Sequence, residues 1–134
     1  MDCFGNKGFI SNGVLHLTPM EAWQAIQDGA ILVDVRPEFQ VKMKSFAVPN
    51  IIFCPYDEIQ RQFDLLPRKK FLVLADAVGL RSKECINFLK EKGFINISNL
   101  AGGIMDWEKD GLPLDKDPSR QLNGPCVCML RSKK

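Results

Sequence analysis

The chain has 134 residues, of which 46% are hydrophobic and 25% charged, and its formal net charge is +2 at pH 7. This length suits one globular domain with a single core, and the near-neutral charge gives no reason to expect binding to nucleic acid or to a membrane surface. No apolar run reaches the ~18 residues of a membrane span, and residues 1–7 do not resemble a signal peptide. The five cysteines are odd in number and irregularly spaced, which favours a reducing cytoplasm over a secreted disulfide framework.

The first elements follow from local signals. Residues 1–13 are small and polar with glycine-containing breaks, and we predict a flexible N-terminal arm. A short strand is expected over residues 14–17. Thr18, Pro19 and Glu21 then predict the start of a helix, because they supply a cap, a proline at the first helical position and the acidic member of a capping box.

A nearly continuous β-branched run over residues 31–36 predicts a central parallel strand that is buried on both faces. Asp34 and Arg36 are too polar for the middle of such a strand and should lie at its carboxyl end. Ligands bind at this edge in open α/β sheets. We expect the two side chains to support loops there, with contact to a ligand as the alternative.

The rest of the chain alternates between strand and helix patterns. Residues 38–50 have no clean period and are expected to form an irregular loop, and residues beyond Leu114 are polar and aperiodic. The sequence therefore predicts an α/β domain over residues 14–114, with a central, mostly parallel five-stranded sheet and helices on both faces, followed by a tail over residues 115–134. The remaining predicted elements are strands over 51–54, 71–75 and 94–100, helices over 56–66 and 83–92, and a sharp turn into a short helix over 101–107.

One loop joins a strand to a helix and carries a glycine and an arginine. Such a loop aims backbone N–H groups at one point, and the helix N-terminus adds a partial positive charge there. The arrangement predicts an anion-binding loop, in which Arg81 would add a full charge. Its residues are Asp76, Ala77, Val78, Gly79, Leu80, Arg81 and Ser82.

Three segments, in this order, resemble the rhodanese-type sulfurtransferase family. Residues 32–36 resemble the family's Asp-Val-Arg strand end, residues 76–82 its Cys-x-x-Gly-x-Arg-Ser loop, and residues 100–113, with Gly102-Gly103, Trp107 and Gly111-Leu112-Pro113, its C-terminal signature. The resemblance covers residues 14–114 and implies the rhodanese-like α/β fold. The loop is one residue shorter than that of the phosphatases that share this fold, which argues against phosphatase activity.

The chain departs from the family pattern at the nucleophile. The resemblance implies that Asp76 stands where family members carry the cysteine whose thiolate accepts sulfur as a persulfide. A carboxylate cannot form a persulfide. The stretch over residues 46–51 also lacks the histidine and glycines of the family's Gly-His-Ile-Pro-Gly-Ala segment. We therefore expect no catalytic residue in this loop.

Asp76 has three interpretations. It caps the helix that begins near Arg81 and orders the loop, it recognises a partner, or it serves some other kind of catalysis. An ionised carboxylate held by several N–H donors would fill the anion site from within. For Arg81 we favour neutralisation of Asp76 over binding of a substrate.

The favoured function is a cytoplasmic, monomeric binding or regulatory module that lacks sulfurtransferase activity at its usual loop. Its partner would be a protein or a sulfur-relay protein, with no nucleic acid, membrane, cofactor or metal. The alternative is a thiosulfate-type sulfurtransferase or sulfur carrier that uses Cys126 or Cys128 as nucleophile, and the second alternative is a dithiol redox protein that uses the same pair. An exposed, dispensable tail or a lipid attachment site is also consistent with these two cysteines. Cys54 and Cys85 are expected to be buried and inert.

Overall fold

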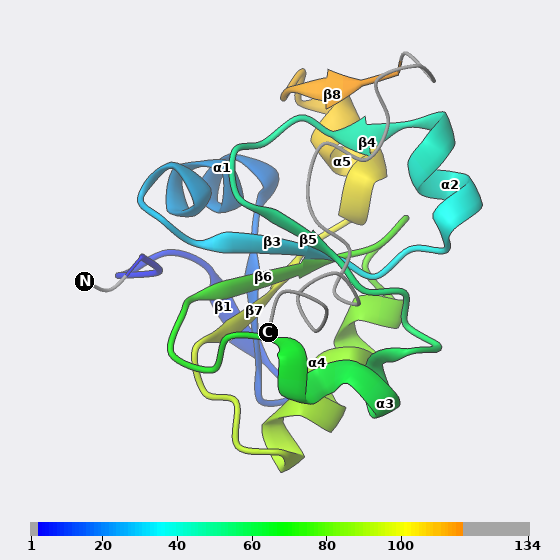
Figure 1. The fold of residues 1–134 in the computed structure, drawn as a ribbon. Helices are drawn as coiled ribbons and strands as arrows, with labels where there is room; N and C mark the ends of the chain where they lie inside the picture. The colour runs from blue at the N-terminus through cyan, green and yellow to red at the C-terminus, as the bar shows by residue number, and fades with distance from the viewer. Residues whose placement is uncertain (1–2, 117–134) are drawn as a thin grey trace.

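The computed structural model describes residues 3–116. Its elements alternate between strand and helix along most of the chain (Figure 1). In chain order they are β1 (Phe9–Ser11), β2 (Val14–Leu17), α1 (Pro19–Gln27), β3 (Ile31–Asp34), α2 (Glu38–Met43), β4 (Ser45–Phe46), β5 (Ile51–Phe53), α3 (Ile59–Gln62), the 3-10 helix η1 (Phe63–Leu65), β6 (Leu72–Ala75), α4 (Arg81–Glu91), β7 (Ile97–Leu100), α5 (Gly103–Lys109) and β8 (Leu114–Asp115).

The central sheet has six strands in the order β1-β2-β7-β6-β3-β5. All neighbouring pairs are parallel except β1 with β2. The predicted α/β fold with a mostly parallel sheet is confirmed, and the predicted number of five strands is corrected to six. The additional strand is β1, which pairs only at the sheet edge and has three exposed residues, so it lacks the alternation that marks a half-buried strand.

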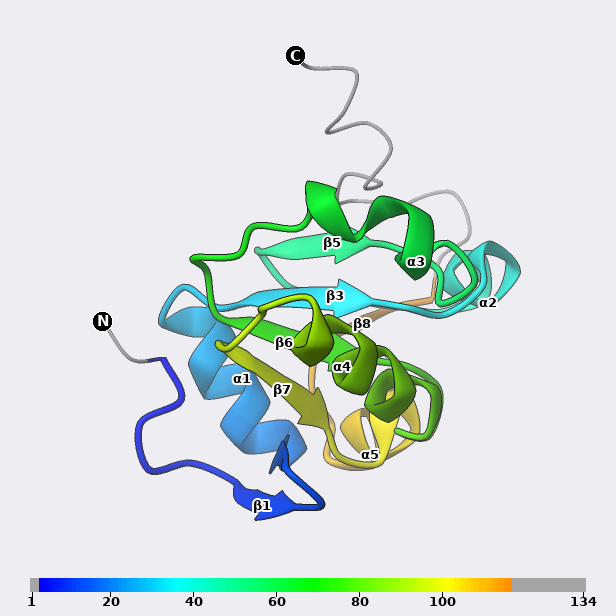
Figure 2. The same cartoon turned by 90° about the horizontal axis from the view of Figure 1, so that it is seen from below.

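Helices cover both faces of the sheet, as predicted (Figures 1 and 2). Helices α1 and α5 lie on one face, and α3 and α4 lie on the other. Trp107 of α5 is fully buried between the rings of Trp23 and Phe46, at centroid distances of 6.0 and 5.2 Å. Its indole N–H donates to the carbonyl of Pro113 at 2.8 Å, which satisfies the polar end of the ring.

The start of α1 forms as the sequence predicts. The Thr18 hydroxyl accepts the backbone N–H of Glu21 at 3.2 Å, and the Glu21 carboxylate accepts the N–H of Thr18 at 2.9 Å. The capping box and Pro19 at the first helical position are both present.

The N-terminal segment is attached to the domain, in contrast to the flexible arm that we predicted. Cys3 and Phe4 are buried, and the Phe4 ring lies edge-on to Phe71 at 4.9 Å. The backbone N–H of Gly8 donates to the second carboxylate oxygen of Glu21 at 3.0 Å. No local pattern in the sequence indicates this anchoring, because each contact joins residues that lie far apart in the chain.

The stretch over residues 38–50, predicted as an irregular loop, contains α2 and β4. Helix α2 has six residues, and β4 pairs with β8 in a separate two-stranded sheet. Elements this short have too few residues to show a period and depend on tertiary contacts. The predicted helix over 56–66 is divided into α3 and η1. Among residues 3–116, no helix is long and apolar enough to cross a bilayer.

Candidate functional site

The candidate site lies at the carboxyl edge of the parallel strands. Asp34 is the last residue of β3 and is paired in register with Ala75, the last residue of β6, so Asp76 follows directly beside it. The strands point toward this end of the molecule, where the loop between β6 and α4 adjoins α5 (Figure 2). The sheet therefore brings together the two predicted groups, Asp34 with Arg36 and the loop over residues 76–82.

The carboxylate of Asp76 accepts three backbone hydrogen bonds from its own loop. One oxygen accepts the N–H of Gly79, and the other accepts the N–H groups of Arg81 at 2.6 Å and Ser82 at 3.3 Å. Asp76 is only 3% exposed. These donors are the N–H groups that the sequence predicts for an anion at the start of α4. The anion they bind in this structure is the side chain of Asp76.

Glycines let the loop and the start of α5 approach closely. Gly79 has a φ of +94°, which favours glycine. A Cβ on Gly103 would lie 2.5 Å from the backbone of Ala77, so a side chain is excluded there. At this approach the N–H of Ile104 donates to the carbonyl of Asp76 at 2.9 Å, and the N–H of Met105 donates to that of Ala77 at 3.2 Å. The Gly102-Gly103 turn thus fixes the backbone from which the Asp76 side chain extends.

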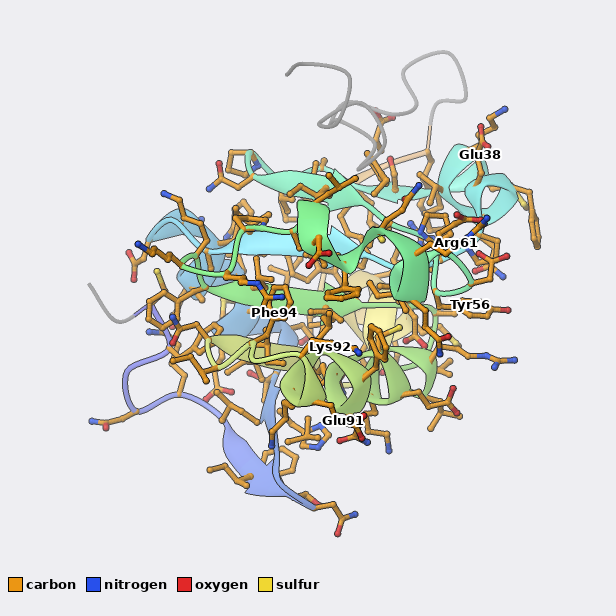
Figure 3. All side chains as sticks on the ribbon, turned by 60° about the horizontal axis from the view of Figure 1, so that its bottom comes forward. Glu38, Tyr56, Arg61, Glu91, Lys92 and Phe94 are labelled. Atoms are coloured by element: carbon orange, nitrogen blue, oxygen red, sulfur yellow. The ribbon has the colours of Figure 1, made fainter. Side chains whose placement is uncertain are left out.

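The guanidinium of Arg81 points away from Asp76. It lies over the Tyr56 ring, 4.7 Å from the centroid, and 3.9 Å from the carboxylate of Glu84. Tyr56 projects outward at the end of the molecule where the strands finish, on the same side as Glu38 (Figure 3). Arg81 therefore contacts Asp76 through its backbone N–H. Its side chain, which carries the charge, is more than half exposed. This corrects the expectation that Arg81 would pair with Asp76.

Asp34 and Arg36 form a buried ion pair. Nε and one terminal nitrogen of Arg36 donate to the two oxygens of Asp34 at 3.0 and 2.7 Å, and the backbone N–H of Arg36 donates at 3.1 Å. The two residues are 0% and 4% exposed. Burial raises the pKa of Asp34, although the bonds from Arg36 favour its charged form. The two side chains thus bond to each other at the carboxyl end of β3, and their support of the loops at this edge stays a prediction.

Sequence reasoning missed a polar network behind the loop. The Ser82 hydroxyl donates to the side-chain oxygen of Asn99, and the Asn99 amide lies 3.1 Å from Nδ1 of His16. All three side chains are at least nine-tenths buried. The register of β2 and β7 places His16 opposite Asn99. Only the strand order reveals this contact, because the two residues are far apart in sequence.

The thiols of the described residues are enclosed. Cys3, Cys54 and Cys85 are buried and form no disulfide among the described residues. Burial, followed by the charge of Asp76, raises the pKa of Cys85 to about 12, so its thiolate is not populated at neutral pH. Within residues 3–116, no cluster of three or more His, Cys, Asp and Glu side chains is arranged to hold a metal ion. Cys126 and Cys128 lie outside the described residues.

Comparison with known proteins agrees with the fold and with the order of the motifs. The family model described as the rhodanese-like domain matches residues 18–110. The chain is 30% identical over 103 residues to the thiosulfate sulfurtransferase GlpE of Haemophilus influenzae. The matched region covers 74% of this chain and 92% of that protein. It is 27% identical over 108 residues to the protein of the same name from Actinobacillus pleuropneumoniae, covering 79% and 97% of the two chains.

Solved structures with a similar fold also have rhodanese-like names. A rhodanese-related protein from Thermoplasma volcanium superposes with a TM-score of 0.69 at 28% identity, covering 76% of this chain and 98% of that one. A rhodanese-like domain protein from Staphylococcus aureus shares the fold, with a TM-score of 0.62 at 24% identity over 69% of this chain and 89% of that one. From the family model, the sequence identity and the fold together, we conclude that the chain belongs to the rhodanese-like domain family.

Proposed function

We propose that this chain is a rhodanese-like domain that does not transfer sulfur at its β6–α4 loop and acts instead as a binding or regulatory module. In this proposal Asp76 stands at the position of the family's nucleophilic cysteine. The observation that carries the proposal is the set of three backbone N–H groups that bind the Asp76 carboxylate.

Sulfur transfer by a rhodanese-type loop requires a thiolate. The thiolate attacks the outer sulfur of thiosulfate, sulfite leaves with the electron pair of the broken S–S bond, and the enzyme persulfide then gives its outer sulfur to an acceptor. Asp76 has no sulfur to form this persulfide. Its carboxylate also occupies the donors that would stabilise an incoming anion, so an oxyanion would meet both a filled site and a like charge.

The buried cysteines do not offer a substitute in this proposal. Cys85 is 4% exposed and its pKa is raised to about 12, and Cys54 is fully buried. Sulfur transfer would then depend on Cys126 or Cys128. The relatives named thiosulfate sulfurtransferase give this alternative its support.

The loop surface is consistent with a binding role. Val78 and Leu80 are 45% and 60% exposed, and Met105 of α5, whose backbone N–H donates to the carbonyl of Ala77 in the loop, is 57% exposed. The Arg81 guanidinium, stacked on Tyr56, adds a charged group that is open to solvent. An apolar loop tip beside an arginine suits binding of a protein partner. A sulfur-relay protein that supplies its own thiol is one such partner. A monomeric state and a cytoplasmic location remain predictions.

The test is the formation of thiocyanate from thiosulfate and cyanide. We expect none from the wild-type chain, while the fold is verified by circular dichroism. Turnover that disappears in the Cys126→Ser/Cys128→Ser double variant would establish the sulfurtransferase alternative. Turnover that persists in this variant would contradict both interpretations, since a loop or core residue would then carry the reaction. The redox alternative requires the two tail thiols to be lost on mild oxidation and restored by reductant.

A further inference from the structure

Helices α2 and α5 present large apolar side chains to solvent. Phe39 and Met43 are four residues apart and therefore share one face of α2. They are 64% and 71% exposed, and Met105 of α5 is 57% exposed. A surface helix normally turns its apolar residues toward the core, but the buried residue of α2 is Val41. We call Phe39, Met43 and Met105 the α2–α5 surface.

Two ion pairs place the end of the described chain beside this surface. One oxygen of Glu108 lies 2.5 Å from the ammonium of Lys44, and the other lies 2.7 Å from that of Lys116. Lys44 directly follows Met43, and Glu108 lies three positions, about one turn, beyond Met105 on α5. Figure 1 shows α2, α5 and β8 together at one end of the molecule. Lys116, the last described residue, is thus a neighbour of the α2–α5 surface.

The sequence that follows Lys116 contains an apolar run. Residues 126–130 read Cys-Val-Cys-Met-Leu, and the nine residues 117–125 join them to Lys116. Nine residues span up to about 30 Å, which is ample for a surface that begins next to Lys116. A short linker also gives the run an effective concentration on the order of 1 mM. A weak apolar contact is therefore enough to hold it.

The charges around the run and the surface favour the same contact. Three basic residues follow the run, namely Arg131, Lys133 and Lys134. Acidic side chains adjoin the apolar ones on both helices, Glu38 on α2 and Asp106 on α5, and both are exposed. Glu38 shares its charge with Lys42 at 3.3 Å. The charges therefore orient the segment, and the apolar contact supplies the binding.

We propose that residues 126–130 bind the α2–α5 surface of their own chain. This contact places Cys126 and Cys128 at the carboxyl edge of the sheet, beside the β6–α4 loop, because the backbone N–H of Met105 donates to the carbonyl of Ala77 in that loop. A protein partner that uses Met105 must then displace the segment. The proposal does not rest on the function proposed above, since the segment docks whether or not its thiols transfer sulfur.

Paramagnetic broadening tests the contact in the full-length protein. A nitroxide is attached to Cys128 in the Cys126→Ser variant, and the methyl groups of Met and Ile are enriched with ¹³C. We expect the methyl signals of Met43 and Met105 to be lost and to return when ascorbate reduces the nitroxide. Ile95 is the control, because it is 83% exposed and precedes β7 at the opposite end of the strands. Its signal should persist.

Two variants of the labelled protein make the test specific. Leu130→Asp places a charge inside the apolar run and should restore the signals of Met43 and Met105. Ser132→Asp adds the same charge outside the run and should leave both signals lost.

Three results would overturn the proposal. The first is a loss at Ile95 as large as that at the two methionines, and the second is equal behaviour of the two Asp variants. The third is signal loss in an enriched, unlabelled chain mixed with a labelled, unenriched one, which would assign the surface to a second copy. None of these signals depends on sulfur transfer, so this proposal and the proposed function fail independently.

Discussion

The backbone N–H of Arg81 donates a hydrogen bond of 2.6 Å to the carboxylate of Asp76. With the N–H groups of Gly79 and Ser82, it makes Asp76 the acceptor that holds the loop against the first turn of α4. The contact spans only five residues of sequence, yet both partners depend on the sheet edge for their positions.

Asp76→Ala should destabilise the domain by about 1–2 kcal/mol, because three N–H groups lose their acceptor at a helix start. Urea unfolding followed by tryptophan fluorescence measures the change. Hydrogen exchange should accelerate at Gly79, Arg81 and Ser82. Asp57→Ala, which removes an exposed carboxylate, is the matched control and should change stability little. Equal stability of the two variants would show that Asp76 does not hold the loop.

Asp76→Cys should create a thiol with a pKa below its ordinary value of about 8.5, because the same N–H groups and the helix N-terminus favour a thiolate. The rate of alkylation by iodoacetamide is measured against pH in a Cys126→Ser/Cys128→Ser background. The background protein with Asp76 intact should react slowly, since its three remaining cysteines are buried. A new thiol that titrates at its ordinary pKa would contradict the loop geometry.

Asp34→Asn should cost about 3 kcal/mol or more, because it leaves the Arg36 guanidinium buried without its counter-charge. Asp34→Asn combined with Arg36→Met should regain part of the loss, since both charges are then gone. Thermal unfolding of the two variants gives the comparison. The two side chains would act independently if Arg36→Met lowered the stability of the Asp34→Asn variant further, by as much as it would cost in the wild-type protein.

The stability of the domain should fall in acid partly through Glu21. The backbone N–H groups of Thr18 and Gly8 bind its carboxylate and lower its pKa below the ordinary 4.5. A lowered folded-state pKa means that this stabilisation is present above pH 4.5 and is lost as the pH falls through the folded-state value.

Glu21→Gln should therefore reduce the slope of stability against pH below about 4.5, as measured by urea unfolding between neutral and acid pH. Glu91→Gln, at an exposed position on α4, serves as the control. An unchanged acid slope in Glu21→Gln would show that this carboxylate does not link the N-terminal segment to α1 in the way that the structure indicates.

Several parts of the structure are predictable from local sequence because their causes are local. The β-branched run over residues 31–34 predicts a buried strand from composition alone. The capping box at Thr18 and Glu21 involves residues three positions apart, so it is visible in the chain directly. The three motif segments, taken in order, are also sufficient to indicate the family, and the family model confirms it.

Other features depend on contacts between distant parts of the chain. Strand β1 and helix α2 are too short to carry a period, and they form because β2 and the β4–β8 pair provide neighbours. The position of the Arg81 guanidinium depends on Tyr56, which lies in a different loop.

Residue types and short-range spacing are thus enough to establish the family, the alternation of strands and helices, and the chemical identity of the group at position 76. They offer binding of the loop's N–H groups as one of three interpretations of Asp76, but they do not reveal which N–H groups its carboxylate binds or that His16 lies beside Asn99; only the folded domain determines these contacts. The difference arises because strand order and register, set by long-range packing, choose the partners of each polar side chain at the sheet edge.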